Sequence, residues 1–212
     1  MMDERATGIV LRTYPLTETS LIVHWLTAEW GRLATVAKGA RRANSPLRGK
    51  LDLYYLCDLS FAPSRRSELH TLREIALRET HALLRRELGW LRQAAYCAAL
   101  LEQTTETDTP LPRIFALFHE LLRHLPRQAP QALTIFAFEM RLLAELGLRP
   151  DLAQAQLSAG AKQILERCLG TGLSELSCLK LGPAQATELR QFLHGFLAFH
   201  LGKVLPTRAA AL

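Results

Sequence analysis

The cations between Arg32 and Lys50 are the residues of this chain with the clearest potential chemistry. The segment holds no aspartate and no glutamate, so its positive charge has no local counterpart. Its basic side chains are those of Arg32, Lys38, Arg41, Arg42, Arg48 and Lys50. Clustered cations without acids among them are typical of a surface that binds a polyanion, and the commonest polyanion is a nucleic-acid backbone. A solvated basic face that only keeps the protein in solution is the alternative for the same residues.

Gly39, Pro46 and Gly49 punctuate this basic segment and predict a loop rather than a helix. Apolar, strand-like runs flank it, so we expect a mobile cationic loop that projects from a small sheet. Aromatic side chains in the neighbouring strands could stack on the bases of a single strand. They are Trp25, Trp30, Tyr54 and Tyr55. A place in the hydrophobic core is an equally good interpretation of Trp25 and Tyr55.

No combination of nucleophile, base and oxyanion donor is evident in the sequence, so we expect a binding protein and not an enzyme. The chain lacks the GxSxG, GxxxxGK[ST] and GxGxxG motifs. The stretch from His119 to His124 (HELLRH) resembles the zinc-protease motif HExxH, but its histidines are five positions apart instead of four. On a helix that spacing separates them by about 140°, so they cannot bind one metal ion.

The cysteines predict neither a zinc site nor a disulfide framework. Cys57, Cys97, Cys168 and Cys178 are scattered and form no CxxC pair. In a reducing compartment, such residues are typically buried free thiols. We therefore expect no metal and no cofactor.

The composition describes a folded, basic protein. Of its 212 residues, 49% are hydrophobic and 22% are charged, and the formal net charge is +6 at pH 7. Such a charge favours nucleic acid or an anionic membrane surface as a partner. No apolar run approaches the roughly 20 residues that a membrane span needs, and the first residues lack a signal-peptide pattern. We expect a cytoplasmic protein with no membrane partner.

The elements that must position the basic segment are short strands followed by helices. Strand-like runs occur at residues 7–13, 20–27, 32–37, 51–62 and 68–75. No helical segment of βαβ spacing separates the early runs, so they predict a small five-stranded closed barrel over residues 1–78. Beyond residue 80 the apolar residues recur at three- and four-residue steps. These steps predict helices at residues 83–101, 113–125, 131–146, 161–169 and 183–201. We therefore expect an α+β protein whose residues 79–212 form an all-helical domain.

Read in order, these residues resemble the RecO family of bacterial recombination mediators. In the strand region the matching motifs are residues 8–12 (GIVLR), 14–23 (YPLTETSLIV), 30–33 (WGRL), 38–42 (KGARR) and 68–72 (ELHTL). In the helical region they are residues 94–96 (AAY) with Glu102 after them, 138–143 (FEMRLL), 146–150 (LGLRP) and 201–208 (LGKVLPTR).

The resemblance implies an N-terminal OB-fold and a helical domain that act in DNA repair and recombination at the bacterial nucleoid. It implies binding of single- and double-stranded DNA and annealing of complementary strands. It also implies partnership with RecR and with the C-terminal tail of the single-stranded DNA-binding protein, leading indirectly to the loading of RecA. The residues expected to hold phosphates are Lys38, Arg41, Arg42, Arg48 and Lys50 in the loop, with Arg12 and Arg32 contributing from strands.

An acidic, apolar-ended peptide tail needs a hydrophobic groove with a cation at its rim. Arg141, beside the apolar stripe at residues 138–143, and Arg113 are the candidates for that cation. An exposed helix arginine without such a role is an equally good interpretation of each.

One departure from the family pattern concerns zinc. Many RecO proteins carry a four-cysteine zinc module soon after the LGxxP stretch, but residues 151–157 (DLAQAQL) contain no cysteine. We infer that no zinc binds there, so that the basic loop and the barrel carry more of the DNA contact. A non-enzymatic scaffold of a ribosomal or membrane-associated assembly is the alternative function, since it too would be basic and free of catalytic motifs.

Overall fold

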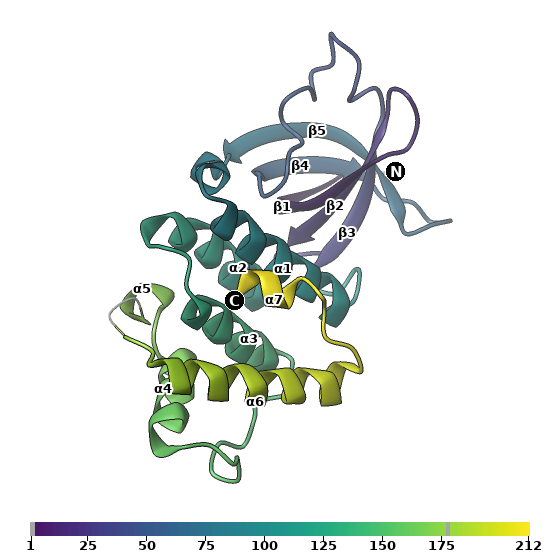
Figure 1. The fold of residues 1–212 in the computed structure, drawn as a ribbon. Coiled ribbons are helices and arrows are strands. Elements are labelled where there is room, and N and C mark those ends of the chain that lie inside the picture. Colours follow the sequence, from purple (N-terminus) through teal and green to yellow (C-terminus); the bar gives the residue numbers. More distant parts are fainter. Residues whose placement is uncertain (1–2, 177–178) are drawn as a thin grey trace. The chain divides into compact units, whose positions relative to one another are not determined.

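The computed structural model describes residues 3–176 and 179–212 (Figure 1), and the chain divides into two compact units. The barrel unit comprises Met1–Ala82 and Thr105–Ala116, and the helical unit comprises Leu83–Thr104 and Leu117–Leu212. The segment Thr105–Ala116 therefore belongs with the strands, although helical sequence flanks it on both sides. Cys178, considered above, lies outside the described residues.

Five strands of the described chain close into a barrel. They are β1 (Glu4–Pro15), β2 (Leu21–Thr27), β3 (Arg32–Ala37), β4 (Leu56–Ala62) and β5 (Leu69–Glu79). Their order around the barrel is β1-β2-β3-β5-β4, with β3 and β5 parallel and the other neighbouring pairs antiparallel. This is the arrangement of an OB-fold, and the predicted fold class is confirmed.

Alternating side chains fill the barrel interior. In β3 every second residue is buried, as expected for a strand with one face on a core. Trp25 of β2 lies inside with no exposed surface, and its indole N–H donates to Thr35 Oγ1 at 2.9 Å. A buried indole needs such an acceptor for its N–H. The core interpretation of Trp25 is therefore the correct one.

A β-bulge in β1 directs Arg12 to the outside of the barrel. Val10 pairs with Trp25 and Arg12 pairs with His24, so the register shifts at Leu11. Without the bulge, Val10 and Arg12 would share one face of the strand. With it, Val10 is buried and Arg12 is exposed.

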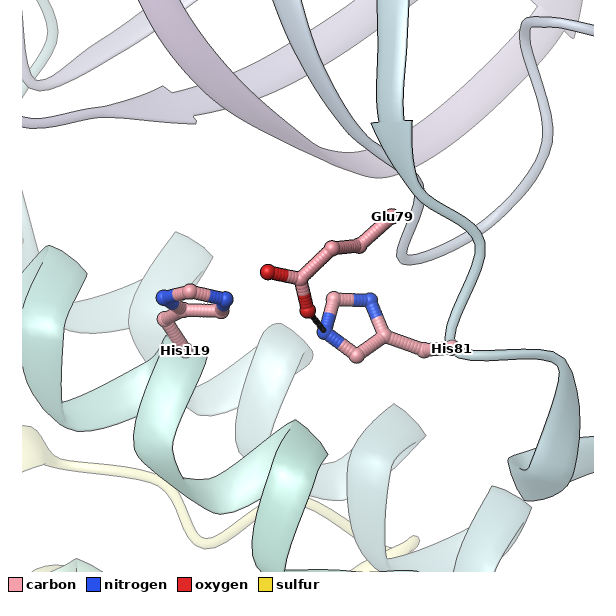
Figure 2. A group of neighbouring side chains, drawn as sticks. All are labelled: Glu79, His81 and His119. Carbon is pink, nitrogen blue, oxygen red and sulfur yellow. Dashed lines mark ion pairs between the residues drawn. The ribbon is translucent and has the colours of Figure 1, made fainter.

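The strand predicted over residues 51–62 is shorter than expected. β4 begins at Leu56, because Tyr54 adopts a left-handed backbone conformation (φ 66°) that a strand does not contain. His81 fixes this corner, with its Nδ1 2.7 Å from the Tyr54 carbonyl oxygen. Figure 2 shows its second contact, in which Nε2 lies 3.4 Å from Glu79 Oε2 at the end of β5. Side-chain contacts thus hold the end of β5 close to the residues that precede β4.

Gly31 lies between β2 and β3, where the segment Thr105–Ala116 crosses the barrel unit. Its φ of 61° and the nearness of the Thr109 carbonyl oxygen leave no space for a side chain. The Asp108 N–H donates to the Arg32 carbonyl oxygen at 3.0 Å and fixes the crossing segment. A glycine is therefore required at this position.

Helices account for most of the remaining described chain. They are η1 (Ala82–Arg86), α1 (Leu88–Thr104), α2 (Pro112–His124), η2 (Leu125–Arg127), α3 (Ala132–Glu145), α4 (Ala159–Gly170), α5 (Leu173–Leu176), α6 (Pro183–Leu201) and α7 (Arg208–Ala211). α6 has the predicted bounds, since Pro183 suits the first helical turn and Gly202, with φ 70°, ends the helix. The helix predicted from residue 83 begins only at Leu88, because a 3₁₀ turn precedes it. None of the described helices is both long enough and apolar enough to cross a membrane.

The helical unit is organised around α3, which is buried along most of its length and packs against α1, α4, α5 and α6. Its Glu139 is fully buried and pairs with Arg208 of α7, with Nε–Oε1 at 2.7 Å and Nη2–Oε2 at 2.9 Å. The Tyr96 hydroxyl of α1 donates to Glu139 Oε1 at 2.5 Å. Burial, and then the Glu139 charge, raise the pKa of Tyr96, so this phenol stays neutral and remains a donor. One buried polar network thus joins α1, α3 and α7.

Candidate nucleic-acid interface

The basic segment between β3 and β4 is a series of tight turns. Backbone hydrogen bonds close turns that end at Arg42, Ser45 and Arg48. Within the first and the third of these turns, Ala40 and Leu47 are buried in the barrel core. Two apolar side chains of the segment thus anchor it in the barrel core, while most of its other residues, among them Lys38, Arg41, Arg42 and Arg48, are exposed as a projecting loop requires.

The basic segment is also fastened to the turn between β1 and β2. The Arg41 N–H donates to the Thr19 carbonyl oxygen at 2.9 Å, and its guanidinium Nη1 donates to the Thr17 carbonyl oxygen at 3.2 Å. The Gly39 N–H donates to Ser20 Oγ at 3.4 Å. The cations therefore start from a partly ordered backbone, which reduces the ordering entropy that binding removes.

The predicted phosphate-binding residues of this segment are mostly solvent-exposed. Lys38, Arg41, Arg42 and Arg48 are exposed, and Lys50 is half-buried. The turn closed by the Arg42 N–H and the Gly39 carbonyl oxygen, at 3.0 Å, brings Lys38, Arg41 and Arg42 together. Arg48 and Lys50 follow in later turns, and Arg48 Nη1 donates to the carbonyl oxygen of Ala43 at 3.1 Å.

The two strand arginines have different surroundings. Arg12 is exposed, and its Nη1 donates to the Tyr14 hydroxyl at 2.7 Å. Arg32 is half-buried and donates to both oxygens of Thr105, with Nε–Oγ1 at 2.9 Å. Arg32 therefore helps to hold the segment Thr105–Ala116 on the barrel, and its contact with phosphate stays a prediction.

The aromatic residues considered for base stacking belong largely to the core. Trp25 is 0% exposed and Tyr54 is 4% exposed. Trp30 and Tyr55 are half-buried and pack against the barrel core. Stacking of a base on Trp25 or Tyr54 is excluded, because neither offers a ring face to solvent.

Two cations that the sequence pattern did not single out, Arg65 and Arg66, lie in the connection between β4 and β5. Both are exposed, and in OB-folds this connection is one of the loops that contact oligonucleotides. Buried His70 fixes the part of this connection that lies next to the strands. Its Nδ1 accepts from the Ser64 N–H at 3.1 Å, and its ring stacks on the Phe61 ring with the centroids 5.3 Å apart. The signal that identifies Arg65 and Arg66 is the strand order, because local sequence does not say which loops an OB-fold uses.

The two arginines proposed for peptide binding lie in different units. Arg141 of α3 is half-buried in the helical unit, where its Nε donates to the Cys168 carbonyl oxygen at 2.8 Å and its Nη1 lies 3.5 Å from Glu120 Oε2. The apolar residues beside it are core residues of α3 and do not line an open groove. Arg113, near the start of α2, is exposed and belongs to the barrel unit.

The helical unit offers a different hollow, of about 590 Å³, between α6 and the segment that leads into α7. Its lining includes apolar Val204 and Leu205 together with exposed Arg190 and His194. It therefore combines apolar walls with basic side chains, as an acidic peptide with an apolar end requires.

The described cysteines do not fit a four-cysteine zinc module. Cys57 lies in the barrel core, Cys97 on α1 and Cys168 on α4, and each is a buried free thiol. Burial raises the pKa of Cys57 and of Cys168 to about 12. Zinc binds the thiolate, so both sites disfavour the form that the metal needs.

The fold and the candidate interface define a class: OB-fold proteins that carry a cationic segment between β3 and β4 and a helical extension. Comparison with known families identifies the member of that class. The family model described as Recombination protein O N terminal matches residues 1–81, and that described as Recombination protein O C terminal matches residues 85–155. The matches cover more than half of the chain, and the chain belongs to the RecO family.

Individual relatives agree with this assignment. The chain is 32% identical to the DNA repair protein RecO of Bacillus pumilus, over 94% of this chain and 80% of that protein. It is 26% identical to the DNA repair protein RecO of Anaeromyxobacter sp. strain K, over 96% of this chain and 94% of that protein. With the protein of the same name from Nitrosospira multiformis the identity is 37%, over 68% of this chain and 58% of the relative.

Proposed function

We propose that this chain is a DNA repair and recombination mediator that binds single- and double-stranded DNA and anneals complementary strands. It would also help to load the recombinase onto DNA coated by single-stranded DNA-binding protein, at the bacterial nucleoid. The observation that carries the proposal is the fastened group of exposed cations at Lys38, Arg41 and Arg42 on the barrel of a RecO family chain.

Annealing needs no bond chemistry, and so no catalytic residue is required. Two DNA strands repel one another through their phosphates, and a cationic surface screens that repulsion while it holds both strands. Neutralised phosphates release their counterions, which makes the affinity depend on salt. Contacts to the backbone carry no sequence information, so sequence preference should be slight.

The test of the interface is the double variant Arg41→Ala, Arg42→Ala, which keeps the backbone N–H that is bonded to Thr19 but removes the guanidinium bond to Thr17. If each arginine neutralises one phosphate, counterion release alone predicts an affinity loss at 0.1 M salt of roughly 25-fold for a single strand and roughly 60-fold for a duplex. The matched control is Arg149→Ala, Arg167→Ala, which removes the same charge from exposed positions of the helical unit. Unchanged DNA affinity of the Arg41, Arg42 variant would contradict the proposal.

Annealing separates this function from a basic scaffold. Mixed with short complementary oligonucleotides, the wild-type chain should raise the rate of duplex formation, and the Arg41, Arg42 variant should raise it much less. A scaffold of a ribosomal or membrane-associated assembly would leave the rate at its spontaneous value.

We also propose that the chain works with RecR and with the C-terminal tail of the single-stranded DNA-binding protein, and through them with RecA. A titration of an acidic tail peptide can compare Arg141→Ala, Arg113→Ala and Arg190→Ala. The engagement of Arg141 with Cys168 and Glu120 favours the hollow beside Arg190 as the place of contact. If only Arg190→Ala lowers the peptide affinity, the peptide binds at the hollow beside Arg190. If Arg141→Ala or Arg113→Ala lowers it, the peptide contacts that arginine instead.

We propose further that this function needs no zinc. Protein purified in the presence of zinc and then dialysed should contain well under one equivalent by elemental analysis, and a chelator should leave DNA binding unchanged. Stoichiometric zinc that a chelator removes together with DNA binding would contradict this.

A further inference from the structure

The outer face of β1, β2 and β3 carries two rows of side chains next to the basic segment. The strand registers pair Arg12 with His24 and His24 with Ala34 in one row, and Tyr14 with Ile22 and Ile22 with Val36 in the next. These positions alternate along β2 with Val23 and Trp25, which are buried in the barrel core, so they face outwards. The face is thus apolar and aromatic, with one cation within it.

Tyr14 and His24 contact each other on this face. Their ring centroids are 5.4 Å apart and their planes are inclined by 66°, an edge-on contact between diagonal neighbours of paired strands. The Arg12 guanidinium carbon lies 5.7 Å from the centre of the Tyr14 ring, in addition to its bond with the hydroxyl. Tyr14 is 39% exposed, and His24 is half-buried. The Tyr14 ring is therefore fixed in orientation while part of its surface remains open.

The chain leads directly from this pair of rings to the cations. β1 continues from Tyr14 into the turn at residues 16–20, to which the Arg41 backbone is fastened. β3 runs from Val36, in the row of Tyr14, to its end at Ala37, and Lys38 follows. The aromatic face and the cations at Lys38 and Arg41 thus lie on connected parts of the barrel, so that one DNA strand could contact both.

We propose that Tyr14 and His24 form a stacking platform for the bases of an unpaired strand, and that this platform lets the barrel distinguish single-stranded from double-stranded DNA. The inference deepens the proposed function and depends on it for the identity of the ligand. Base stacking on aromatic rings accepts any base, because every base has a π-face. In a duplex those faces are covered by neighbouring base pairs, so the platform serves unpaired strands, whereas the cations serve both forms.

The first test compares Tyr14→Phe with Tyr14→Leu. Phenylalanine keeps the ring and loses only the hydroxyl that accepts from Arg12, whereas leucine keeps apolar bulk without a π-face. For a dT oligonucleotide at fixed salt, Tyr14→Phe should bind within about 2-fold of wild type, and Tyr14→Leu should lose roughly 5- to 150-fold, the range that stacking on one aromatic side chain supports. Hairpin duplex affinity and the slope of log affinity against log salt should stay unchanged in both variants.

The second test removes the bases instead of the ring. An oligonucleotide of the same length with abasic sites keeps its phosphates, so wild type should bind it more weakly than the dT strand with the same salt slope. In Tyr14→Leu the difference between the two oligonucleotides should be clearly smaller than in wild type, because only the His24 ring is left to stack on a base. The platform proposal would be overturned if Tyr14→Leu bound the dT strand as tightly as wild type does. It would also be overturned if this variant lost as much affinity for the duplex as for the single strand.

The two proposals fail in different ways. If only the platform proposal is wrong, the Arg41, Arg42 variant still binds duplex DNA more weakly than wild type. If the basic-interface proposal is wrong, that variant binds every DNA as wild type does. Thermal unfolding of each Tyr14 variant within about 2 °C of wild type shows that the barrel remains folded, since a half-exposed side chain contributes little to stability.

Discussion

Breaking the buried ion pair between Glu139 and Arg208 should destabilise the helical unit strongly. Both side chains are almost completely buried, at 0% and 3% exposed, and they share two hydrogen bonds. Arg208→Met leaves the Glu139 carboxylate buried without its counter-charge. Removing one partner of such a pair costs roughly 3–5 kcal/mol. In a chain of this size, each kcal/mol lowers Tm by roughly 2–4 °C, so we expect a fall of roughly 6–20 °C.

The assay is a thermodynamic cycle followed by circular dichroism during thermal and urea unfolding. Its variants are Arg208→Met, Glu139→Leu and the double variant, each also made with Tyr96→Phe because the Tyr96 hydroxyl donates to Glu139. Replacing a whole buried pair by apolar residues is often nearly neutral. The triple variant should therefore recover most of the stability that Arg208→Met loses. Single losses that simply add in the double variant would refute the reasoning, because they would show that the two charges do not depend on one another.

Other predictions concern a glycine, the buried thiols and their pH dependence. Gly31→Ala should lower the urea midpoint far more than Gly49→Ala: both glycines have positive φ, but only at Gly31 does the added methyl group collide with backbone, the Thr109 carbonyl. Equal midpoints for the two variants would contradict the close packing of the crossing segment. Because burial raises the pKa of Cys57 and Cys168 from the ordinary value of 9.0 to about 12, the unfolded chain loses these protons first as pH rises. Stability should therefore fall between pH 9 and pH 12, and Cys168→Ala should show a shallower fall in urea midpoint than wild type. A slope that this substitution leaves unchanged would show that the thiol is not responsible.

The elements that the sequence predicts well are those whose signals are local. β3 and α6 have the predicted bounds, since β3 alternates strictly and α6 begins at Pro183 and ends before Gly202. β4 was predicted to start too early, because residues 51–55 are as apolar as a strand and nothing in their composition indicates the left-handed conformation of Tyr54. Local sequence thus predicts the type of an element more reliably than the residue at which it begins, when the backbone before it is irregular.

The candidate interface was predictable in composition but not in geometry. The cations of the basic segment are evident in the sequence, yet the burial of Ala40 and Leu47 depends on a barrel core built from distant strands. Arg32 donates to Thr105, which is far away in the sequence, so no local pattern predicts this hydrogen bond. The outward direction of Arg12 depends on the bulge at Leu11, which sets every later residue of β1 on the opposite face.

The salt dependence of DNA affinity tests most directly the claim that the basic segment binds phosphates. Affinities of the wild type and of the Arg41→Ala, Arg42→Ala variant are measured between 50 and 300 mM salt, on one single strand and one duplex. If both arginines contact phosphates, the slope of log affinity against log salt should become shallower in the variant by about 1.4 for the single strand and about 1.8 for the duplex. The Arg149→Ala, Arg167→Ala control should keep the wild-type slope. Equal slopes for the wild type and the Arg41, Arg42 variant would show that the DNA phosphates lie elsewhere.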